Sequence, residues 1–134
     1  MDFVRPAAVA LVEDDADFRQ ALSERLSLEG FDVREFPAAE PALKAIGADF
    51  PGVVVTDLRM PGLDGRQLLA RLQAQDGDLP VIMMTGHGDI ADAVAAVQNG
   101  AYDFVAKPLA FVPVLGRLKR ALGTESGKRM LERI

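Results

Sequence analysis

The sequence predicts an α/β domain in which one parallel sheet is covered by helices on both faces. Two observations carry this prediction. Five short apolar runs bounded by turn residues recur along the 134 residues, and each run is followed by a segment with apolar residues at helical spacing. The connections suit right-handed strand–helix–strand units, which build parallel sheets. A chain of this length holds one domain with one core.

The five apolar runs are the expected strands. Three of them, AVALV, GVVVT and VIMMT, are apolar nearly throughout, which is typical of strands covered on both faces. The run FDVREF alternates apolar and polar residues, which suits an edge strand. The expected strands cover residues 7–12, 31–36, 52–56, 81–85 and 104–106.

Capping residues and glycines mark the ends of the expected helices. Asp17 and Asp89 are expected to cap the first and fourth helices, and Asp64 to serve the turn before the third. Gly30 and Gly100 are expected to end the first and fourth helices. The helices are expected over residues 17–30, 39–46, around 68–72, 90–99 and 112–122.

Composition excludes several classes of function. The chain has no cysteine, which excludes disulfides, thiolate metal sites and cysteine nucleophiles, and fits a reducing cytoplasm. One histidine leaves little for a His-rich metal site or a Ser-His-Asp triad. With 15 basic and 20 acidic residues the formal charge is −5, which disfavours nucleic-acid binding by this domain. The sequence has no apolar run of transmembrane length and no secretory signal pattern.

Chemically active side chains follow four of the five expected strands. In an open α/β sheet, sites form beyond the carboxyl ends of the strands. We therefore expect these residues to meet at one edge, where turn chemistry alone explains them poorly. They are Glu13, Asp14 and Asp15 after the first strand, Asp57 after the third, Thr85 at the end of the fourth and Lys107 after the fifth.

These residue types suit phosphoryl transfer. Crowded carboxylates repel one another unless a cation neutralises them, and an all-oxygen donor set favours Mg²⁺ or Mn²⁺. Lys107 offers a compact positive charge to a phosphoryl oxygen, and Thr85 offers a hydroxyl. A carboxylate can act as a nucleophile and form an aspartyl phosphate. Asp57, at the end of a buried strand, is the natural candidate.

Four stretches in order, LVEDDADFRQAL, VVVTDLRMPGLDG, LPVIMMTGHGD and NGAYDFVAKP, resemble the receiver domain of two-component response regulators. TGHGDI and GAYDFVAKP are most similar to the NtrC-like class, especially regulators of C4-dicarboxylate transport, while TGHGD is shared with FixJ-like receivers. The resemblance implies a flavodoxin-like, doubly wound sheet of five parallel strands in the order 2-1-3-4-5 with five helices. It also implies a receiver domain over residues 1–123, with 124–134 as a tail or the start of a linker helix.

The resemblance also implies metal and phosphate roles for individual residues. Asp57 would be the phosphoacceptor and a metal ligand. Asp14 would bind Mg²⁺ directly, Glu13 would act through water, and the backbone carbonyl of Arg59 would complete the protein ligands. Arg59 and His87 stand where the family tunes the lifetime of the phosphate.

A switch is implied by the same resemblance. Thr85 and Lys107 would contact the phosphoryl group, and Phe104 would turn inward when Thr85 is drawn to it. The surface of the fourth helix, fifth strand and fifth helix would then rearrange. The Lys107–Pro108 bond is expected to be cis. Leu109 stands where the family usually has an aromatic residue.

The implied partners are a sensor histidine kinase as phosphoryl donor, a second copy of the chain after phosphorylation, and an output domain beyond Ile134. The resemblance implies a cytoplasmic transcriptional switch that binds neither nucleic acid nor membrane directly. We expect no turnover enzyme, since such a domain would catalyse only its own phosphorylation and slow dephosphorylation.

Other interpretations of the same residues stay open. An aspartyl phosphatase needs a second acid two residues after the nucleophile, where this chain has Arg59. A flavin module needs a phosphate-binding loop after the first strand, where Glu13 and Asp14 would repel phosphate. A pseudo-receiver would use the fold only as an interaction surface. Taken singly, Asp57 suits a turn, and Phe104 suits the core.

Overall fold

Five strands alternate with five helices in the computed structural model, which describes residues 7–86, 89–107 and 111–122. None of the described helices is long and apolar enough to cross a membrane. The elements are β1 (Ala8–Val12), α1 (Ala16–Leu28), β2 (Asp32–Phe36), α2 (Ala39–Ala45), β3 (Gly52–Asp57), α3 (Gly65–Gln75), β4 (Val81–Thr85), α4 (Ile90–Gln98), β5 (Asp103–Ala106) and α5 (Phe111–Ala121).

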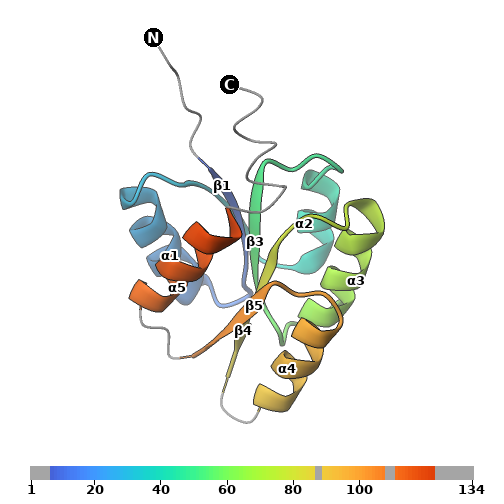
Figure 1. The fold of residues 1–134 in the computed structure, drawn as a ribbon. Coiled ribbons are helices and arrows are strands. Elements are labelled where there is room, and N and C mark those ends of the chain that lie inside the picture. The colour runs from blue at the N-terminus through green and yellow to red at the C-terminus, as the bar shows by residue number, and fades with distance from the viewer. Residues whose placement is uncertain (1–6, 87–88, 108–110, 123–134) are drawn as a thin grey trace.

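The strands form one parallel sheet in the order β2-β1-β3-β4-β5. Helices α1 and α5 cover one face, and α2, α3 and α4 cover the other (Figure 1). The predicted fold class and strand order are therefore confirmed. The order reverses between β1 and β3, so the carboxyl ends of these two strands border the place where such folds bind ligands.

The core consists of two apolar clusters, one on each face of the sheet. Alternate residues of one strand supply both: Ala8, Ala10 and Val12 of β1 face the α2–α4 side, while Val9 and Leu11 face the α1–α5 side. Strands β1, β3 and β4 are buried along their whole length, whereas β2 has exposed positions. The apolar and alternating runs in the sequence thus correspond to central and edge strands, as predicted.

Two strands extend slightly beyond their predicted bounds. β3 includes Asp57, so the carboxylate belongs to the last strand residue and lies on the rigid part of the sheet. β5 begins at Asp103, one residue early. Gly30 and Gly100 lie where predicted, with φ of +95° and +116°, a region in which side chains with a Cβ are strained.

The predicted cap of α1 is wrong by two residues. Asp15, not Asp17, is the N-cap, and its side chain accepts a hydrogen bond of 3.1 Å from the Phe18 N–H. Asp17 lies in the first turn, where a negative charge favours the helix dipole. The helix begins earlier because Ala16 is a good helix former.

The two other acids expected near helix starts, Asp64 in a turn and Asp89 as a cap, differ in what they do. Asp64 forms a capping box with Gln67 at the start of α3. Asp89 occupies the N-cap position of α4 but makes no side-chain capping bond. Its carboxylate accepts hydrogen bonds from Arg59 instead.

Candidate functional site

Strand register brings four predicted residues to one edge of the sheet. Glu13 and Asp57 lie at the same level, because the residues before them on β1 and β3 are register partners. Thr85 lies one residue beyond the β4 partner of Asp57, and Lys107 one residue beyond the β5 partner of Thr85. The sheet itself therefore sets the spacing of the site.

Lys107 joins two acids from different strands. Its Nζ donates to Glu13 Oε1 at 2.5 Å and to Asp57 Oδ2 at 3.1 Å. Its backbone N–H donates to the Thr85 carbonyl at 2.7 Å, which fixes the start of the side chain beside β4. We call Glu13, Asp57 and Lys107 the strand-end triad.

Burial dominates the electrostatics of the triad. The Glu13 side chain is fully buried, and those of Asp57 and Lys107 are only 12% and 25% exposed. Burial raises the pKa of Glu13 from 4.5 to about 7; the bond from Lys107 opposes this rise and neighbouring Asp57 adds to it. Burial disfavours the charge on Lys107, but its bonds to Glu13 and Asp57 outweigh that effect and raise its pKa.

Three carboxylates at this edge form a donor set that fits a divalent cation. Glu13, Asp14 and Asp57 each place an oxygen within 4.8 Å of the others. Lys107 occupies one oxygen of Glu13 and one of Asp57. Among the described residues, the second oxygens accept only long hydrogen bonds, from Asp15 N–H at 3.4 Å and Arg59 N–H at 3.5 Å. Asp14 is exposed, so the cluster opens to solvent on its side. Oxygen donors without nitrogen or sulfur are those that Mg²⁺ prefers.

The loop after β3 returns close to Asp57. The Gly65 N–H donates to the Leu58 carbonyl at 2.9 Å, which joins the start of α3 to the end of β3. A Cβ on Gly65 would lie 2.6 Å from the Asp57 carbonyl oxygen. Only glycine permits this approach, which brings α3 against the site.

The predicted switch residues flank the triad. The Thr85 side chain is buried, and its hydroxyl donates to the Gly86 carbonyl at 3.3 Å. Phe104 is half-buried and packs against the core cluster on the α2–α4 face. His87, Pro108 and Leu109 lie outside the described residues, as does the predicted tail over 124–134. The roles and the cis bond expected there stay predictions.

Sequence reasoning missed two contacts of Lys107. It assigned Glu13 to a metal-bound water, whereas the structure also pairs it directly with Lys107, because a glutamate reaches further than an aspartate. The second missed contact is with Phe18, which was not among the predicted site residues. The Lys107 Nζ lies 4.5 Å from the centroid of the Phe18 ring. The sequence feature that could have indicated this contact is the position of the aromatic residue, five residues after Glu13 and in the first turn of α1.

A second ion-pair cluster lies beside the triad and was also missed. Arg59 Nη2 lies 2.9 Å from Asp89 Oδ1 and 3.0 Å from Asp92 Oδ2, so the loop after β3 is joined to the start of α4. The Arg59 side chain is 68% exposed. We call Arg59, Asp89 and Asp92 the surface ion-pair cluster.

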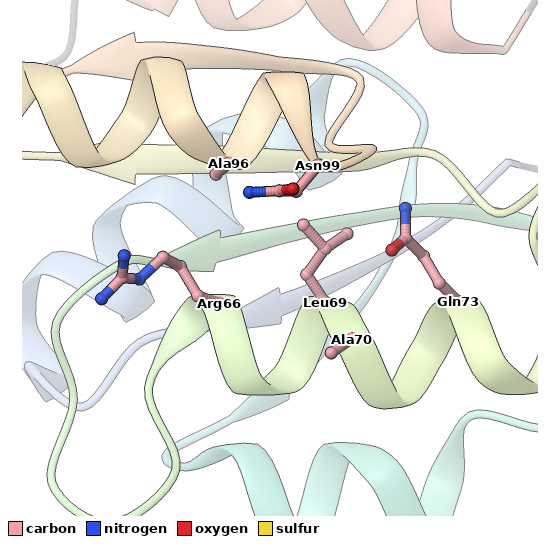
Figure 2. Close-up of a pocket in the computed structure, with 6 residues that line it drawn as sticks. All are labelled: Arg66, Leu69, Ala70, Gln73, Ala96 and Asn99. Carbon is pink, nitrogen blue, oxygen red and sulfur yellow. The ribbon is translucent and has the colours of Figure 1, made fainter.

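A hollow of about 310 Å³ lies between α3 and α4 (Figure 2). Among the described lining residues, Arg66 alone is charged, and it lies 3.8 Å from Asp92. The described lining residues offer no carboxylate or hydroxyl that could act as a nucleophile, in contrast to the strand-end edge. The lining residues are Arg66, Leu69, Ala70, Gln73, Ala96 and Asn99.

The sequence is similar to known proteins over most of its length. The family model described as the response regulator receiver domain matches residues 9–119, most of the chain. The chain belongs to this family. The receiver is 49% identical over 114 residues to the C4-dicarboxylate transport transcriptional regulatory protein DctD of Rhizobium meliloti, covering 85% of this chain and 25% of that protein. It is 40% identical over 114 residues to the DNA-binding transcriptional regulator NtrC of Proteus hauseri, covering 85% and 24%.

Solved structures include similar receivers. The receiver domain of NtrX from Brucella abortus has a TM-score of 0.81 and 38% identity, covering 86% of this chain and 98% of that one. The predicted resemblance to NtrC-like receivers, and to DctD-type regulators in particular, is thus confirmed. The receiver spans about a quarter of the length of the DctD and NtrC proteins.

Proposed function

We propose that this receiver is a phosphorylation-dependent switch that accepts a phosphoryl group on Asp57 from the phosphohistidine of a sensor histidine kinase. One observation carries the proposal. Lys107 Nζ contacts the Asp57 carboxylate at 3.1 Å, beside a cluster of three acids whose oxygens approach within 4.8 Å. A nucleophile, a cation for the phosphoryl oxygens and oxygen ligands for a metal therefore share one edge.

The transfer balances without a further reactant. A carboxylate oxygen of Asp57 attacks phosphorus, the new O–P bond forms, and the N–P bond of the donor breaks. The electron pair returns to the imidazole nitrogen, which takes up a proton from water. Lys107 shifts its hydrogen bond from the Asp57 carboxylate oxygen to a phosphoryl oxygen. Its positive charge balances part of the negative charge of the phosphoryl group, so Lys107 stays in contact with the reacting groups throughout the transfer.

Mg²⁺ fits the donor set at this edge. Asp14 and Asp57 would bind it directly, Glu13 through water, and the Arg59 backbone carbonyl would complete the protein ligands. When bound, the metal neutralises charge on the carboxylates and the phosphoryl oxygens. Glu13 and Asp57 each keep one oxygen free of Lys107, so metal and lysine can be held together.

The switch would run from Thr85 and Phe104 to the surface of α4, β5 and α5. Drawing the Thr85 hydroxyl from Gly86 to the phosphoryl group would open space for Phe104 to turn inward. Helix α4 carries Ile90, Val94 and Val97 on an exposed face, at 43%, 42% and 36% exposure. We propose that a second copy covers this face after phosphorylation.

The dimer is tested by light scattering after size exclusion, with and without acetyl phosphate and Mg²⁺. Phosphorylated wild type should be dimeric, and phosphorylated Val94→Asp monomeric. Thr85→Ala should accept phosphate yet stay monomeric. A dimer formed equally well by both phosphorylated variants would overturn the proposed surface and switch.

The output would lie outside this chain. The relatives named above are transcriptional regulators about four times as long as the matched segment, and the receiver corresponds to one quarter of each. We therefore propose a receiver over residues 1–123 that controls a linked transcriptional domain in the cytoplasm, with residues 124–134 leading toward it.

The phosphoacceptor assignment is tested by intact mass. Purified chain is incubated with Mg²⁺ and acetyl phosphate, beside Asp57→Asn and, as a control outside the triad, Asp89→Asn. Wild type and Asp89→Asn should gain one phosphoryl group that hydroxylamine removes, and Asp57→Asn should gain none. Equal uptake by Asp57→Asn would refute the site. No uptake by folded, Mg²⁺-binding wild type would favour a pseudo-receiver.

A further inference from the structure

The ammonium group of Lys107 meets an aromatic ring as well as its two acids. Two of its contacts are hydrogen bonds, to Glu13 and Asp57. The third is the Phe18 ring, with Nζ 4.5 Å from the centroid. A cation at this distance over a phenylalanine face is attracted by the ring quadrupole, and more strongly where water is excluded. The Lys107 side chain is only 25% exposed.

Phe18 is held where it meets Lys107. Its N–H donates to the N-cap Asp15 at 3.1 Å, which fixes the first turn of α1 beside the site. Its side chain is half-buried and packs against the core cluster on the α1–α5 face. The ring therefore stands on a rigid element and has little freedom to leave the ammonium group.

We propose that Phe18 is a positioning residue, which holds the Lys107 ammonium group against Asp57 and its phosphoryl group. This proposal rests on the proposed function of the same site. Lysine carries a compact charge on a flexible four-carbon stem, so the side chain alone does not fix the position of its ammonium group. The ring restrains that charge without accepting a directional hydrogen bond. Lys107 can thus turn from a carboxylate to a phosphoryl oxygen while it stays on the ring.

A plain core role for Phe18 is the competing explanation. Leucine at position 18 keeps an apolar side chain but has no quadrupole, whereas tyrosine keeps the ring face. Site-specific incorporation of mono-, di- and trifluorophenylalanine weakens the ring quadrupole stepwise with little change in size. The matched control is Leu22→Ala, since Leu22 lies one turn further along α1 in the same core cluster.

The first measurement is the initial rate of phosphorylation by acetyl phosphate and Mg²⁺, with thermal unfolding of each variant. Phe18→Leu should lower the rate about fivefold, as expected for losing one partly buried cation–π contact. Phe18→Tyr should restore it to within about twofold. Fluorination should lower the rate in steps with an unchanged unfolding temperature. Leu22→Ala should lower the unfolding temperature but not the rate. A flat fluorine series or a normal rate in Phe18→Leu would overturn the proposal.

The second measurement needs no phosphorylation. Methylene protons next to a charged nitrogen above a ring resonate upfield, so the Lys107 ε-methylene signal should be shifted upfield in the untreated wild type and in Phe18→Tyr. The signal is assigned by its loss in Lys107→Arg. It should return to the ordinary lysine position in Phe18→Leu. An ordinary position in wild type would refute the Phe18 contact, whereas absent phosphorylation with an upfield signal would refute only the proposed function.

Discussion

Two neighbouring ion-pair clusters contain the same kinds of groups at similar distances, yet they differ in burial. In the strand-end triad, Nζ of Lys107 lies 2.5 and 3.1 Å from its acids, whose side chains are 0% and 12% exposed. In the surface ion-pair cluster, Nη2 of Arg59 lies 2.9 and 3.0 Å from acids that are 19% and 37% exposed. Because water screens exposed charges, the strand-end triad should contribute far more to the free energy of unfolding than the surface ion-pair cluster, although the distances are similar.

The largest expected effect comes from removing the cation of the triad. Lys107→Met leaves two carboxylates at a buried edge without their partner. In metal-free protein at pH 8, the free energy of unfolding should fall by about 2–3 kcal/mol, somewhat less than for a fully buried pair. Urea denaturation measures it. Added Mg²⁺ should recover part of the loss.

The matched change in the surface cluster is Arg59→Met. It should leave the free energy of unfolding unchanged within experimental error, since the arginine side chain is 68% exposed. Equal losses of unfolding free energy in Lys107→Met and Arg59→Met would show that burial does not determine how much each cluster contributes to stability.

The next effect is a pH dependence that belongs to the triad alone. Glu13 has a pKa of about 7 in the folded protein and 4.5 as its ordinary value, so the folded state binds the proton more tightly. The free energy of unfolding of the metal-free protein should therefore fall by about 3 kcal/mol as pH rises from 4.5 to 7, and then level off.

Glu13→Gln tests this pH dependence, because the variant has no proton to lose at that position. The unfolding free energy of Glu13→Gln should not decrease between pH 4.5 and 7. The exposed control Glu35→Gln should show the same decrease as the wild type. An unchanged slope in Glu13→Gln would assign the titration to another group.

A smaller effect is expected at the phosphoacceptor itself. Asp57→Asn removes one of two mutually repelling acids and relieves Glu13, so the metal-free protein should become more stable by about 1 kcal/mol at pH 8. Thermal and urea unfolding both measure this gain. A loss of stability would mean that the Lys107 contact outweighs the repulsion.

The smallest effect concerns local opening of α4. Arg59→Met removes the link between the loop after β3 and the first turn of α4. Amide hydrogen exchange there should quicken a few-fold at low salt, because local opening becomes easier. In 1 M NaCl the difference should vanish, since the screening length falls to about 3 Å. A difference that persists would point to packing instead.

The sequence was sufficient for the fold because its patterns have local causes. Fully apolar runs become central strands, and the alternating run at 32–36 becomes an edge. The triad was predicted as a set because strand ends of a parallel sheet share one edge. Strand ends do not specify which side chain faces which, so the direct Glu13–Lys107 pair and the Phe18 ring escaped prediction.

Long-range ion pairs near the surface leave even less signal in the sequence. Asp89 looks like an ordinary helix cap, and it does occupy that position. Its carboxylate is taken by Arg59, 30 residues away in sequence, and no local pattern encodes such a choice. The cap at Asp15 rather than Asp17 reflects a two-residue uncertainty, since both acids suit the start of a helix.

A crystal structure with Mg²⁺ and beryllofluoride is the decisive experiment on whether the strand-end triad accepts a phosphoryl group. We expect beryllium on an oxygen of Asp57, Mg²⁺ at about 2.1 Å from carboxylate oxygens of Asp14 and Asp57, and Lys107 Nζ on a fluorine. A structure that binds Mg²⁺ but leaves Asp57 unmodified, with Lys107 still on both acids, would contradict this role of the triad.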